Sequence, residues 1–426
     1  MADIKAFKGL RFTEKAGEIS ALTCPPYDII SEQQRLAYLE RNGNNIIRLE
    51  LPRDGENPYA QAGETLKKWL DDEVLALDEK PAIYVYEEEF DANGKRLKIN
   101  GIICRVKIEE FSKGVVLPHE ETLSKAKVDR FNLMDSTLCN FSQIYSLYKD
   151  SEGDTQKIID ATSLLPCTSE FTDGDNVTHR LWSITDENII AELVKQFVDR
   201  KLYIADGHHR YETSLNFRNS LRERGLAKEG DGCDYIMMML VDMANPGLVV
   251  FPTHRLVRDL IEFDANAVVE GCKDYFDISS ESGVENIESK LTALYDEGKH
   301  AFGFYCKDDE WKLMVLRDES VLAELMPEKS KALRELDVSI LHTLVLEKIM
   351  GIDAENMAKQ INLYYTRSFD EALSEVRCGN AQCTFILNPT RVSEISQVAT
   401  NGEKMPQKST YFYPKLITGL VMNKLM

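Results

Sequence analysis

The sequence LYIADGHHRYETSL, from Leu202 to Leu215, contains a short apolar run that stops at Asp206-Gly207 and is followed by a stretch typical of a helix. This pattern predicts a strand, a tight turn and the first turn of a helix. The first amides of a helix lie at the positive end of its dipole, so an anion can bind there, and His and Arg side chains add donors. The stretch therefore predicts a phosphate-binding turn. Its candidate residues are Asp206, His208, His209 and Arg210.

The same turn also has a purely structural explanation, in which Asp206 caps the helix and Gly207 makes the turn. In that case the His and Arg side chains would be solvated and would have no role in binding. Four polar residues between an apolar strand and an amphipathic helix are more than capping requires. We therefore interpret the turn as a functional site.

Composition sets the broad class of the protein. The chain has 426 residues, of which 43% are hydrophobic, so it can bury a large core and is expected to form two or three domains. Its 71 acidic residues outnumber 51 basic ones, for a net charge of -20. Such a charge opposes binding to nucleic acid over a wide surface, although it is compatible with a basic pocket.

Membrane segments and cross-links are not expected. The first residues lack an apolar stretch of signal-peptide length, and no apolar run approaches the roughly 20 residues that span a bilayer. We therefore expect a cytoplasmic protein. Its nine cysteines are odd in number and form no C-x-x-C pair, unlike a disulfide framework or a zinc site.

Hydrophobic patterns predict a mixed α/β (α+β) fold in two parts, residues 1–245 and residues 246–426. In the first part a helix is expected over 186–198, before the turn. Strands are expected there at 46–51, 82–88, 102–108, 144–148, 179–184 and 235–242. The second part is a C-terminal α/β lobe, in which a β-α-β unit over 361–387 is followed by a loop, 402–415, that we expect to return to the active site.

Two further segments are rich in reactive groups. Residues 118–130, PHEETLSKAKVDR, hold acids, bases and hydroxyls with almost no apolar filling, a pattern of neither a core strand nor an amphipathic helix. An exposed charged loop explains this segment about as well as a functional one does. Residues 402–415, GEKMPQKSTYFYPK, place lysines beside paired hydroxyls, which suits a phosphate, and tyrosines that can wall a pocket.

Known nucleotide motifs do not explain residues 402–415. They nearly match the P-loop pattern G-x-x-x-x-G-K-[ST], but Gln407 replaces the second glycine, and Asn401-Gly402 is typical of a helix end rather than of the strand before a P-loop. The sequence also has no G-x-G-x-x-G turn in the strand-to-helix context that a nicotinamide cofactor needs. His254-Arg255 is a weaker candidate site, because a buried structural histidine explains it at least as well.

Taken together, the three motifs resemble those of the free serine kinases of the ParB/sulfiredoxin-like superfamily. They are Pro-His-Glu at 118–120, Asp-Gly-His-His-Arg at 206–210 and Pro-Gln-Lys-Ser-Thr at 406–410, in the same chain order. Over nearly its whole length the chain is also similar to domain-of-unknown-function family 1015, a similarity to which Pro-Pro-Tyr-Asp at 25–28 and Lys-Val-Asp-Arg at 127–130 contribute. The resemblance implies a ParB/sulfiredoxin-like catalytic core with large insertions and a second α/β lobe.

The resemblance further implies an enzyme that transfers a phosphoryl group to the hydroxyl of free L-serine, giving O-phospho-L-serine. The donor would be ATP, ADP or pyrophosphate, with Mg2+ at its phosphates. Glu120 would be the base, with His119 beside it, and Asp206 would orient the acceptor or bind the magnesium. Lys127 and Arg130 lie outside the kinase motifs and are assigned to the donor phosphates. The other phosphate-binding or nucleotide-binding candidates are His208, His209, Arg210, Lys408, Ser409 and Thr410.

Two other functions fit the same residues. One is a nucleotide-binding or DNA-binding module of the ParB type, although the net charge and the lack of a helix-turn-helix pattern argue against DNA. The other is a phosphohydrolase, which would use the same anion pocket with water in place of the hydroxyl. The expected partners are small-molecule substrates, with no nucleic acid and no membrane, and the sequence leaves the oligomeric state open.

Phosphoryl transfer makes a geometric demand on these motifs. Base, acceptor and donor clamps must contact the same few atoms. We therefore expect Glu120, Asp206 to Arg210, and Lys408 to Thr410 to line one cleft, although they lie far apart in the sequence.

Overall fold

The computed structural model describes residues 2–122, 124–283, 286–306 and 310–425, which form two compact units. Unit 1 contains Met1–Pro118, Thr122–Val249 and Pro414–Met426, and unit 2 contains His119–Glu121 and Val250–Tyr413. The expected C-terminal lobe of residues 246–426 therefore differs from unit 2 at its end. The reason is that residues 414–426 make their sheet and core contacts within unit 1.

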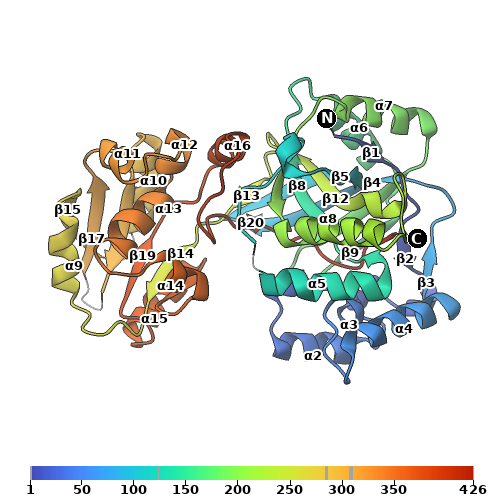
Figure 1. Ribbon diagram of the computed structural model, residues 1–426, viewed down its shortest axis with the longest axis horizontal. Helices are drawn as coiled ribbons and strands as arrows, with labels where there is room; N and C mark the ends of the chain where they lie inside the picture. The colour runs from blue at the N-terminus through green and yellow to red at the C-terminus, as the bar shows by residue number, and fades with distance from the viewer. Residues whose placement is uncertain (1, 123, 284–285, 307–309, 426) are drawn as a thin grey trace. The chain divides into compact units, whose positions relative to one another are not determined.

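Unit 1 is built on a nine-stranded mixed sheet, visible in Figure 1. Its strands follow the order β6-β11-β8-β12-β5-β4-β10-β9, with β1 paired to β5. β6 pairs with β11 in parallel, as does β8 with β12, and the other described pairs are antiparallel. The strands of this sheet are β1 (Ile4–Lys5), β4 (Ile83–Ala92), β5 (Lys95–Lys107), β6 (Val116–Leu117), β8 (Ile144–Tyr148), β9 (Ser169–Thr172), β10 (Thr178–Ile184), β11 (Leu202–Asp206) and β12 (Tyr235–Asp242).

Helices and short strand pairs surround this sheet. The helices are α1 (Ile19–Leu22), α2 (Glu32–Arg41), α3 (Ile47–Glu50), α4 (Pro58–Asp71), α5 (Ser124–Thr137), α6 (Asp154–Ser163), α7 (Glu187–Phe197) and α8 (His208–Glu223). The short pairs are β2 (Leu10–Phe12) with β3 (Leu75–Leu77), and β7 (Cys139–Asn140) with β21 (Asn423–Lys424).

The central strands are buried on both faces, as their unbroken apolar sequences predict. Every residue of β12 from Tyr235 to Val241 is buried. α6, α7 and α8 share a core with one face of β4, β5 and β12. Residues 414–425 run along the other face, where the Arg105 side chain of β5 donates hydrogen bonds to Asn423 Oδ1 at 2.6 Å and to the Lys424 carbonyl at 2.7 Å.

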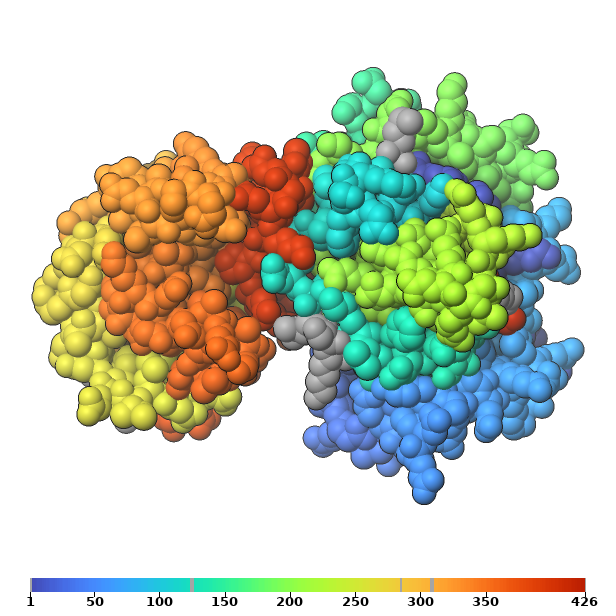
Figure 2. Space-filling view, in the orientation of Figure 1, coloured from blue at the N-terminus to red at the C-terminus, as the bar shows by residue number. Residues whose placement is uncertain are grey.

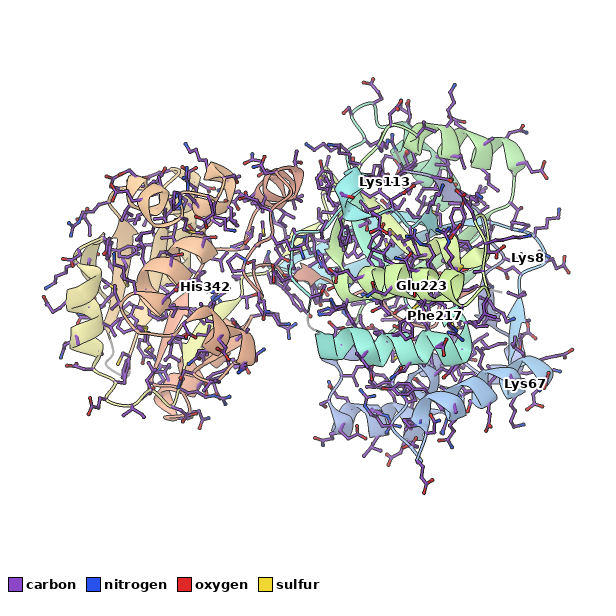
Figure 3. All side chains as sticks on the ribbon, in the orientation of Figure 1. Lys8, Lys67, Lys113, Phe217, Glu223 and His342 are labelled. Atoms are coloured by element: carbon purple, nitrogen blue, oxygen red, sulfur yellow. The ribbon has the colours of Figure 1, made fainter. Side chains whose placement is uncertain are left out.

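α5 and α8 lie side by side and pack through aromatic side chains (Figure 1). Phe217 of α8 faces α5 (Figure 3) and contacts Phe131, with ring centroids 5.6 Å apart. The interpretation of 118–130 as neither helix nor strand is therefore wrong for its later part, which begins α5. Because a charged residue occupies one position of the buried stripe, the sequence lacks an amphipathic helix pattern. This stripe consists of Arg130, Leu133, Met134 and Thr137.

The strand expected at 46–51 is also wrong, because Ile47–Glu50 form the short helix α3. The Asn45 side-chain oxygen accepts a hydrogen bond from the Ile47 amide at 2.9 Å and so favours the helical turn. A short apolar run fits a buried strand and a buried helical turn equally well, so its periodicity does not separate the two. The other strands expected in this part of the chain are confirmed as β4, β5, β8, β10 and β12, and the helix before the turn is confirmed as α7.

Unit 2 is built on a six-stranded antiparallel sheet with the order β15-β17-β16-β19-β14-β18. β18 and β19 both pair with β14, which lies between them, so the expected β-α-β unit is present with one strand inserted. The strands are β14 (His254–Val257), β15 (Phe276–Ser282), β16 (Ala301–Tyr305), β17 (Glu310–Leu316), β18 (Leu363–Thr366) and β19 (Cys383–Ile386).

Helices cover both faces of the second sheet. α10 and α15 share one core with it, and α9, α11 and α13 share the other. α11, α12 and α16 lie together at one edge of unit 2 in the view of Figure 2. The helices are α9 (Ala265–Cys272), α10 (Ile287–Asp296), α11 (Ser320–Leu325), α12 (Lys331–Arg334), α13 (Asp337–Ile340) with a π-helix over Leu341–Glu347, α14 (Ala354–Lys359), α15 (Phe369–Arg377) and α16 (Val392–Thr400).

Among the helices that the structure describes, none combines the length and apolar character needed to cross a lipid bilayer.

Candidate functional site

The predicted turn between β11 and α8 is present in unit 1. β11 ends at Asp206, Gly207 adopts a left-handed conformation with φ of 94°, and α8 begins at His208. Arg210, one turn into the helix, donates from Nη2 to Asp206 Oδ2 at 2.9 Å and from Nη1 to the Gln143 carbonyl. The turn therefore places a carboxylate and a guanidinium at the positive end of the α8 dipole.

A second cation completes this cluster. Lys415 Nζ lies 2.7 Å from Asp206 Oδ1, although the two residues are 209 positions apart in the sequence. Burial raises the pKa of Asp206, but the charges of Lys415 and Arg210 outweigh it and hold that pKa well below its ordinary value. Asp206 is thus ionised throughout the physiological range. A carboxylate of this kind orients charged groups and is too weak a base to accept the proton of a hydroxyl group.

The same geometry bears on the expected magnesium site. Both oxygens of Asp206 already contact a cation, one from Lys415 and one from Arg210. In the described parts of the chain, no three His, Cys, Asp or Glu side chains are grouped closely enough to hold a metal ion. Both oxygens of Asp206 thus have cationic partners in this structure, and the assignment of a magnesium ion to Asp206 stays a prediction.

The buried carboxylate of Glu50 lies close enough to this cluster to interact with the charge of Arg210. Glu50 of α3 accepts a hydrogen bond from the Ser142 hydroxyl at 2.9 Å, and its carbonyl accepts one from Arg130 Nη1 at 2.7 Å. Burial raises the pKa of Glu50 above its ordinary value, and the charges of Arg130 and Arg210 offset only part of that rise. The Arg130 guanidinium also lies 4.0 Å from the centre of the Tyr27 ring. Arg130 is only 4% exposed, so its contacts in this structure are with protein groups.

Lys127, the other residue assigned to the donor phosphates, lies on the same helix as Arg130. Its ammonium contacts Glu212 Oε2 of α8 at 2.9 Å, and the Thr122 hydroxyl donates to the same oxygen at 2.6 Å. Lys127 therefore links α5 to α8. The assignment of Lys127 and Arg130 to the donor phosphates stays a prediction.

The other two motifs meet in unit 2. The Met405 amide donates to the His119 carbonyl at 2.7 Å, and Glu120 forms a parallel bridge with Met405. The Thr410 hydroxyl lies 3.0 Å from His119 Nε2 and 3.4 Å from Glu120 Oε1. Segments about 290 residues apart thus bring a carboxylate, an imidazole and a hydroxyl within hydrogen-bond reach of one another.

The lysine loop is fixed by its backbone and leaves its lysine exposed. Lys408 has a positive φ of 57°, which is unusual for a residue with a side chain. Its carbonyl accepts a hydrogen bond from Arg255 Nη2 of β14 at 3.1 Å. The next carbonyl, of Ser409, accepts one from the Thr390 hydroxyl at 2.9 Å, and the Ser409 hydroxyl donates to the Pro406 carbonyl. The backbone of Lys408 is thus fixed, and its side chain is exposed on unit 2.

The predicted site residues therefore form two groups. In unit 1 they are Asp206, His208, His209 and Arg210, together with Lys127 and Arg130. In unit 2 they are His119, Glu120, Lys408, Ser409 and Thr410. In unit 2 the structure brings His119 and Glu120 into contact with the sequence-distant Thr410. In unit 1 Asp206 contacts Arg210 of the same motif. The expectation that one cleft holds both groups stays a prediction.

Sequence reasoning missed three residues that hold these groups in place. Lys415 is the last residue of the lysine segment, and no local pattern links a lysine to an aspartate 209 positions away. Glu50 was hidden in an apolar run that suggested a strand. Arg255 was noted beside His254, but nothing in the sequence connected it to the Lys408 carbonyl.

A family model described as "Protein of unknown function (DUF1015)" matches residues 4–339. Among solved structures, a free serine kinase in complex with AMP is similar at 13% identity with a TM-score of 0.39, covering 77% of this chain and 94% of that chain. A conserved hypothetical protein from Pyrococcus furiosus is similar at 16% identity with a TM-score of 0.37, covering 74% and 94%.

A third solved structure, SbnI with C-terminal truncation from Staphylococcus aureus, is similar at 10% identity with a TM-score of 0.37, covering 76% of this chain and 87% of that chain. No curated protein matches the sequence. The structural likenesses are distant and carry no argument about activity.

Proposed function

This chain belongs to the family described as "Protein of unknown function (DUF1015)", and from the geometry of its own residues we propose that it is a phosphotransferase with an alcohol group as acceptor. The proposed acceptor is free L-serine, which becomes O-phospho-L-serine. The ParB/sulfiredoxin-like character of the catalytic core belongs to the same proposal and rests on the resemblance of the three motifs.

The observation that carries the proposal is the group around Thr410 in unit 2. A carboxylate, Glu120, and an imidazole, His119, lie within hydrogen-bond reach of a hydroxyl on the loop that also presents Lys408. Phosphoryl transfer needs a proton acceptor close to a cation that binds phosphate. The backbone bridge between Glu120 and Met405 joins the two segments that carry these groups.

Glu120 is the proposed base and Lys408 the proposed phosphate clamp. The serine hydroxyl oxygen forms a bond to the phosphorus of the donor, and the bond between that phosphorus and its bridging oxygen breaks. The hydroxyl proton passes to Glu120. Lys408 and the Thr410 hydroxyl offset the negative charge on the transferred group.

The cluster in unit 1 has the mixed charge that a free amino acid requires. Asp206 is a permanent anion that can accept a hydrogen bond from the ammonium group of serine. Arg210, Lys415 and the positive end of α8 can bind its carboxylate. A free amino acid presents both an ammonium and a carboxylate to such a cluster, whereas a neutral polyol presents neither. The unit 1 cluster therefore supports an amino-acid acceptor.

Phosphorus NMR tests the proposal directly. Purified protein is incubated with L-serine, Mg2+ and ATP, ADP or pyrophosphate in turn, and the signal of O-phospho-L-serine is expected with at least one donor. D-serine and glycerol serve as acceptor controls and should react at least tenfold more slowly. Absence of any phosphorylated product with all donors and a panel of hydroxylated amino acids would overturn the proposal, and donor hydrolysis without acceptor would identify a phosphohydrolase.

A further inference from the structure

A pocket of about 330 Å3 lies entirely within unit 2, next to the lysine loop. It is bordered by α13, the π-helix, α14 and residues 404–407, so it ends one residue before Lys408. Its volume is within the range of sites that bind small organic molecules.

Most of the lining is apolar and adaptable. Three thioethers, from Met326, Met357 and Met405, face the same space as the Tyr365 ring and the Pro406 ring. Methionine side chains adjust to flat ligands and make favourable sulfur contacts with aromatic rings. Leu333, Ala354 and Ala358 complete the apolar surface. This composition fits a flat ring system better than a compact anion.

Two buried polar groups lie in the same lining. Ser339 is 1% exposed, and among the described residues its hydroxyl has no hydrogen-bond partner. Burying a hydroxyl without a partner destabilises the folded protein, so a native chain keeps one mainly where a ligand or water bonds it. Ser339 thus brings a hydroxyl with an unfilled hydrogen bond to the lining of this pocket.

His342, labelled in Figure 3, is the second polar group. Its Nε2 accepts a hydrogen bond from Arg255 Nε at 3.3 Å. Burial, and after it the charge of Arg255, hold the pKa of His342 well below its ordinary value. The ring is therefore neutral with its proton on Nδ1, which makes His342 a hydrogen-bond donor on the pocket wall.

The charge around the pocket is positive. Arg255, behind His342, is 1% exposed, and the hydrogen bonds described for its guanidinium go to neutral acceptors, the His342 ring and the Thr253 and Lys408 carbonyls. Lys329 and Lys404 lie on the pocket lining, where the single acidic residue is Glu121. An uncompensated buried cation is costly unless an anion approaches it. The site therefore favours a ligand that joins a flat ring to a negative group.

We propose that this pocket binds the heteroaromatic base and sugar of the phosphoryl donor. The inference rests on the proposed function and narrows it: the donor is a nucleoside phosphate rather than bare pyrophosphate. The base lies among the methionines and Tyr365, with its polar edge at Ser339 and His342. Gln407 leads from the pocket to Lys408, so the phosphates of the same molecule extend toward the loop.

Binding measurements test the pocket without requiring turnover. The full chain is titrated with AMP, adenosine and inorganic pyrophosphate by calorimetry. AMP and adenosine should bind, and Ala358→Trp should weaken both at least tenfold by filling the pocket, while leaving pyrophosphate affinity within twofold. Ala358 is exposed, so the larger side chain does not disturb the core. Ala293→Trp, at an exposed alanine of α10 outside the pocket, is the matched control and should bind like the wild type.

Ser339→Ala separates ligand binding from a structural role. Removal of a hydroxyl without a partner should leave the melting temperature unchanged or higher, while AMP affinity falls about threefold to tenfold. A lower melting temperature with unchanged AMP affinity would show that Ser339 is structural and would count against the pocket.

The outcomes for this pocket and for the kinase are distinguishable. Loss of AMP binding in Ala358→Trp supports the pocket even if no donor gives phosphoserine, a result that overturns the kinase alone. A different result would overturn the pocket alone. In that case the wild type and Ala358→Trp form phosphoserine from pyrophosphate at equal rates, and neither AMP nor adenosine binds. Equal AMP affinity in the wild type and Ala358→Trp also overturns it.

Discussion

At the scale of single residues, the charge on each group follows from the neighbours that the fold gives it. Asp206 and Glu88 are both acidic residues on strands of the same sheet, and their pKa values move in opposite directions. Two cations hold Asp206 ionised, whereas burial without a cation raises the pKa of Glu88 to about 8. Asp206 is therefore suited to binding charged groups, whereas the titration of Glu88 affects the stability of the protein.

Replacement of Glu120 and of Lys408 should affect different kinetic parameters. Glu120→Gln keeps the shape but removes the proton acceptor, so kcat should fall by about 10² to 10⁴ with donor affinity nearly unchanged. Lys408→Ala removes a phosphate-binding cation and should weaken donor binding by about 1.5 to 3 kcal/mol. Calorimetric donor titrations and steady-state rates on both variants test the assignment, with Lys299→Ala, at an exposed lysine of the same unit, as control.

Weakened donor binding in Glu120→Gln with normal turnover at saturation would contradict the base assignment. It would show that Glu120 holds ligand. Asp206 could not then take over the proton, because its pKa is held low by Lys415 and Arg210.

Glu88 should make the stability of the protein depend on pH. It is fully buried, accepts a hydrogen bond from the Tyr86 hydroxyl at 2.9 Å, and has no partner among the described residues for its other oxygen. His179 and Asp173 lie in the same network. The unfolded carboxyl loses its proton near its ordinary pKa of 4.5, but the folded one keeps it up to about pH 8. The free energy of unfolding therefore falls as the pH rises through this window.

Glu88→Gln removes that titration. Its stability advantage over the wild type should grow from pH 5 to pH 8, to about 2 to 5 kcal/mol, and then level off. Denaturant unfolding at a series of pH values measures it. Glu87→Gln, at the adjacent buried glutamate, should instead lower stability at pH 7, because Glu87 pairs with Lys98 and Arg180. An advantage of Glu88→Gln that is the same at pH 5 and pH 8 would refute the assignment.

At the scale of elements, strands in the core were predictable because continuous apolar runs have few other uses. The turn between β11 and α8 was also predictable, since Asp-Gly after an apolar run is a local signal. α5 was not, because Arg130 takes a buried position that patterns reserve for apolar residues. Contacts with Glu50, Asp129 and Tyr27 stabilise the buried Arg130 guanidinium, and hydrophobic periodicity does not detect contacts of this kind.

The two glycines that flank α8 should respond differently to alanine. Gly207 and Gly225 both have positive φ values, 94° and 68°, so either substitution introduces backbone strain of about 1 kcal/mol. A Cβ at Gly225 would meet nothing within 4 Å, whereas one at Gly207 would lie 2.9 Å from Arg210 Nε. Both variants should lose similar stability, but only Gly207→Ala should also lose at least tenfold in phosphoserine formation.

Thermal unfolding and the phosphorus NMR assay on the two variants decide this. Equal activity losses in Gly207→Ala and Gly225→Ala would mean that α8 stability, and not the position of Arg210, governs the site.

At the scale of the whole molecule, the path of the chain does not follow the division into units. Residues 119–121 belong to unit 2, although unit 1 precedes and follows them, and residues 414–426 belong to unit 1. No composition shift or linker marks these passages, so the sequence predicted one boundary near residue 245. Local sequence signals predict the structure within each motif. The contacts between motifs depend on how the chain passes from one unit to the other, which no local signal shows.

Removal of residues 414–426 should unfold unit 1 and spare unit 2. The segment buries Leu416, Ile417, Leu420, Val421, Met422 and Leu425 within unit 1. At about 1.5 to 3 kcal/mol for each side chain, their loss exceeds the usual stability of a domain. Hydrogen exchange should show loss of protection in β4, β5 and β12, with protection retained in β14 and β19.

Met422→Ala gives a milder form of the same test. It should lower the stability of unit 1 by about 2 to 5 kcal/mol and leave exchange in unit 2 unchanged. Protected unit 1 strands in the truncated chain would show that the segment is dispensable.

The position of residues 414–426 also sets an order of events during synthesis. A ribosome that has completed residues 1–249 must still translate residues 250–413 before it reaches the segment that lies on the unit 1 sheet. At about 5 to 20 residues per second, this interval lasts roughly 10 to 35 seconds. Unit 1 is therefore begun first and completed last. During that interval one face of its sheet is exposed to chaperones and to neighbouring nascent chains.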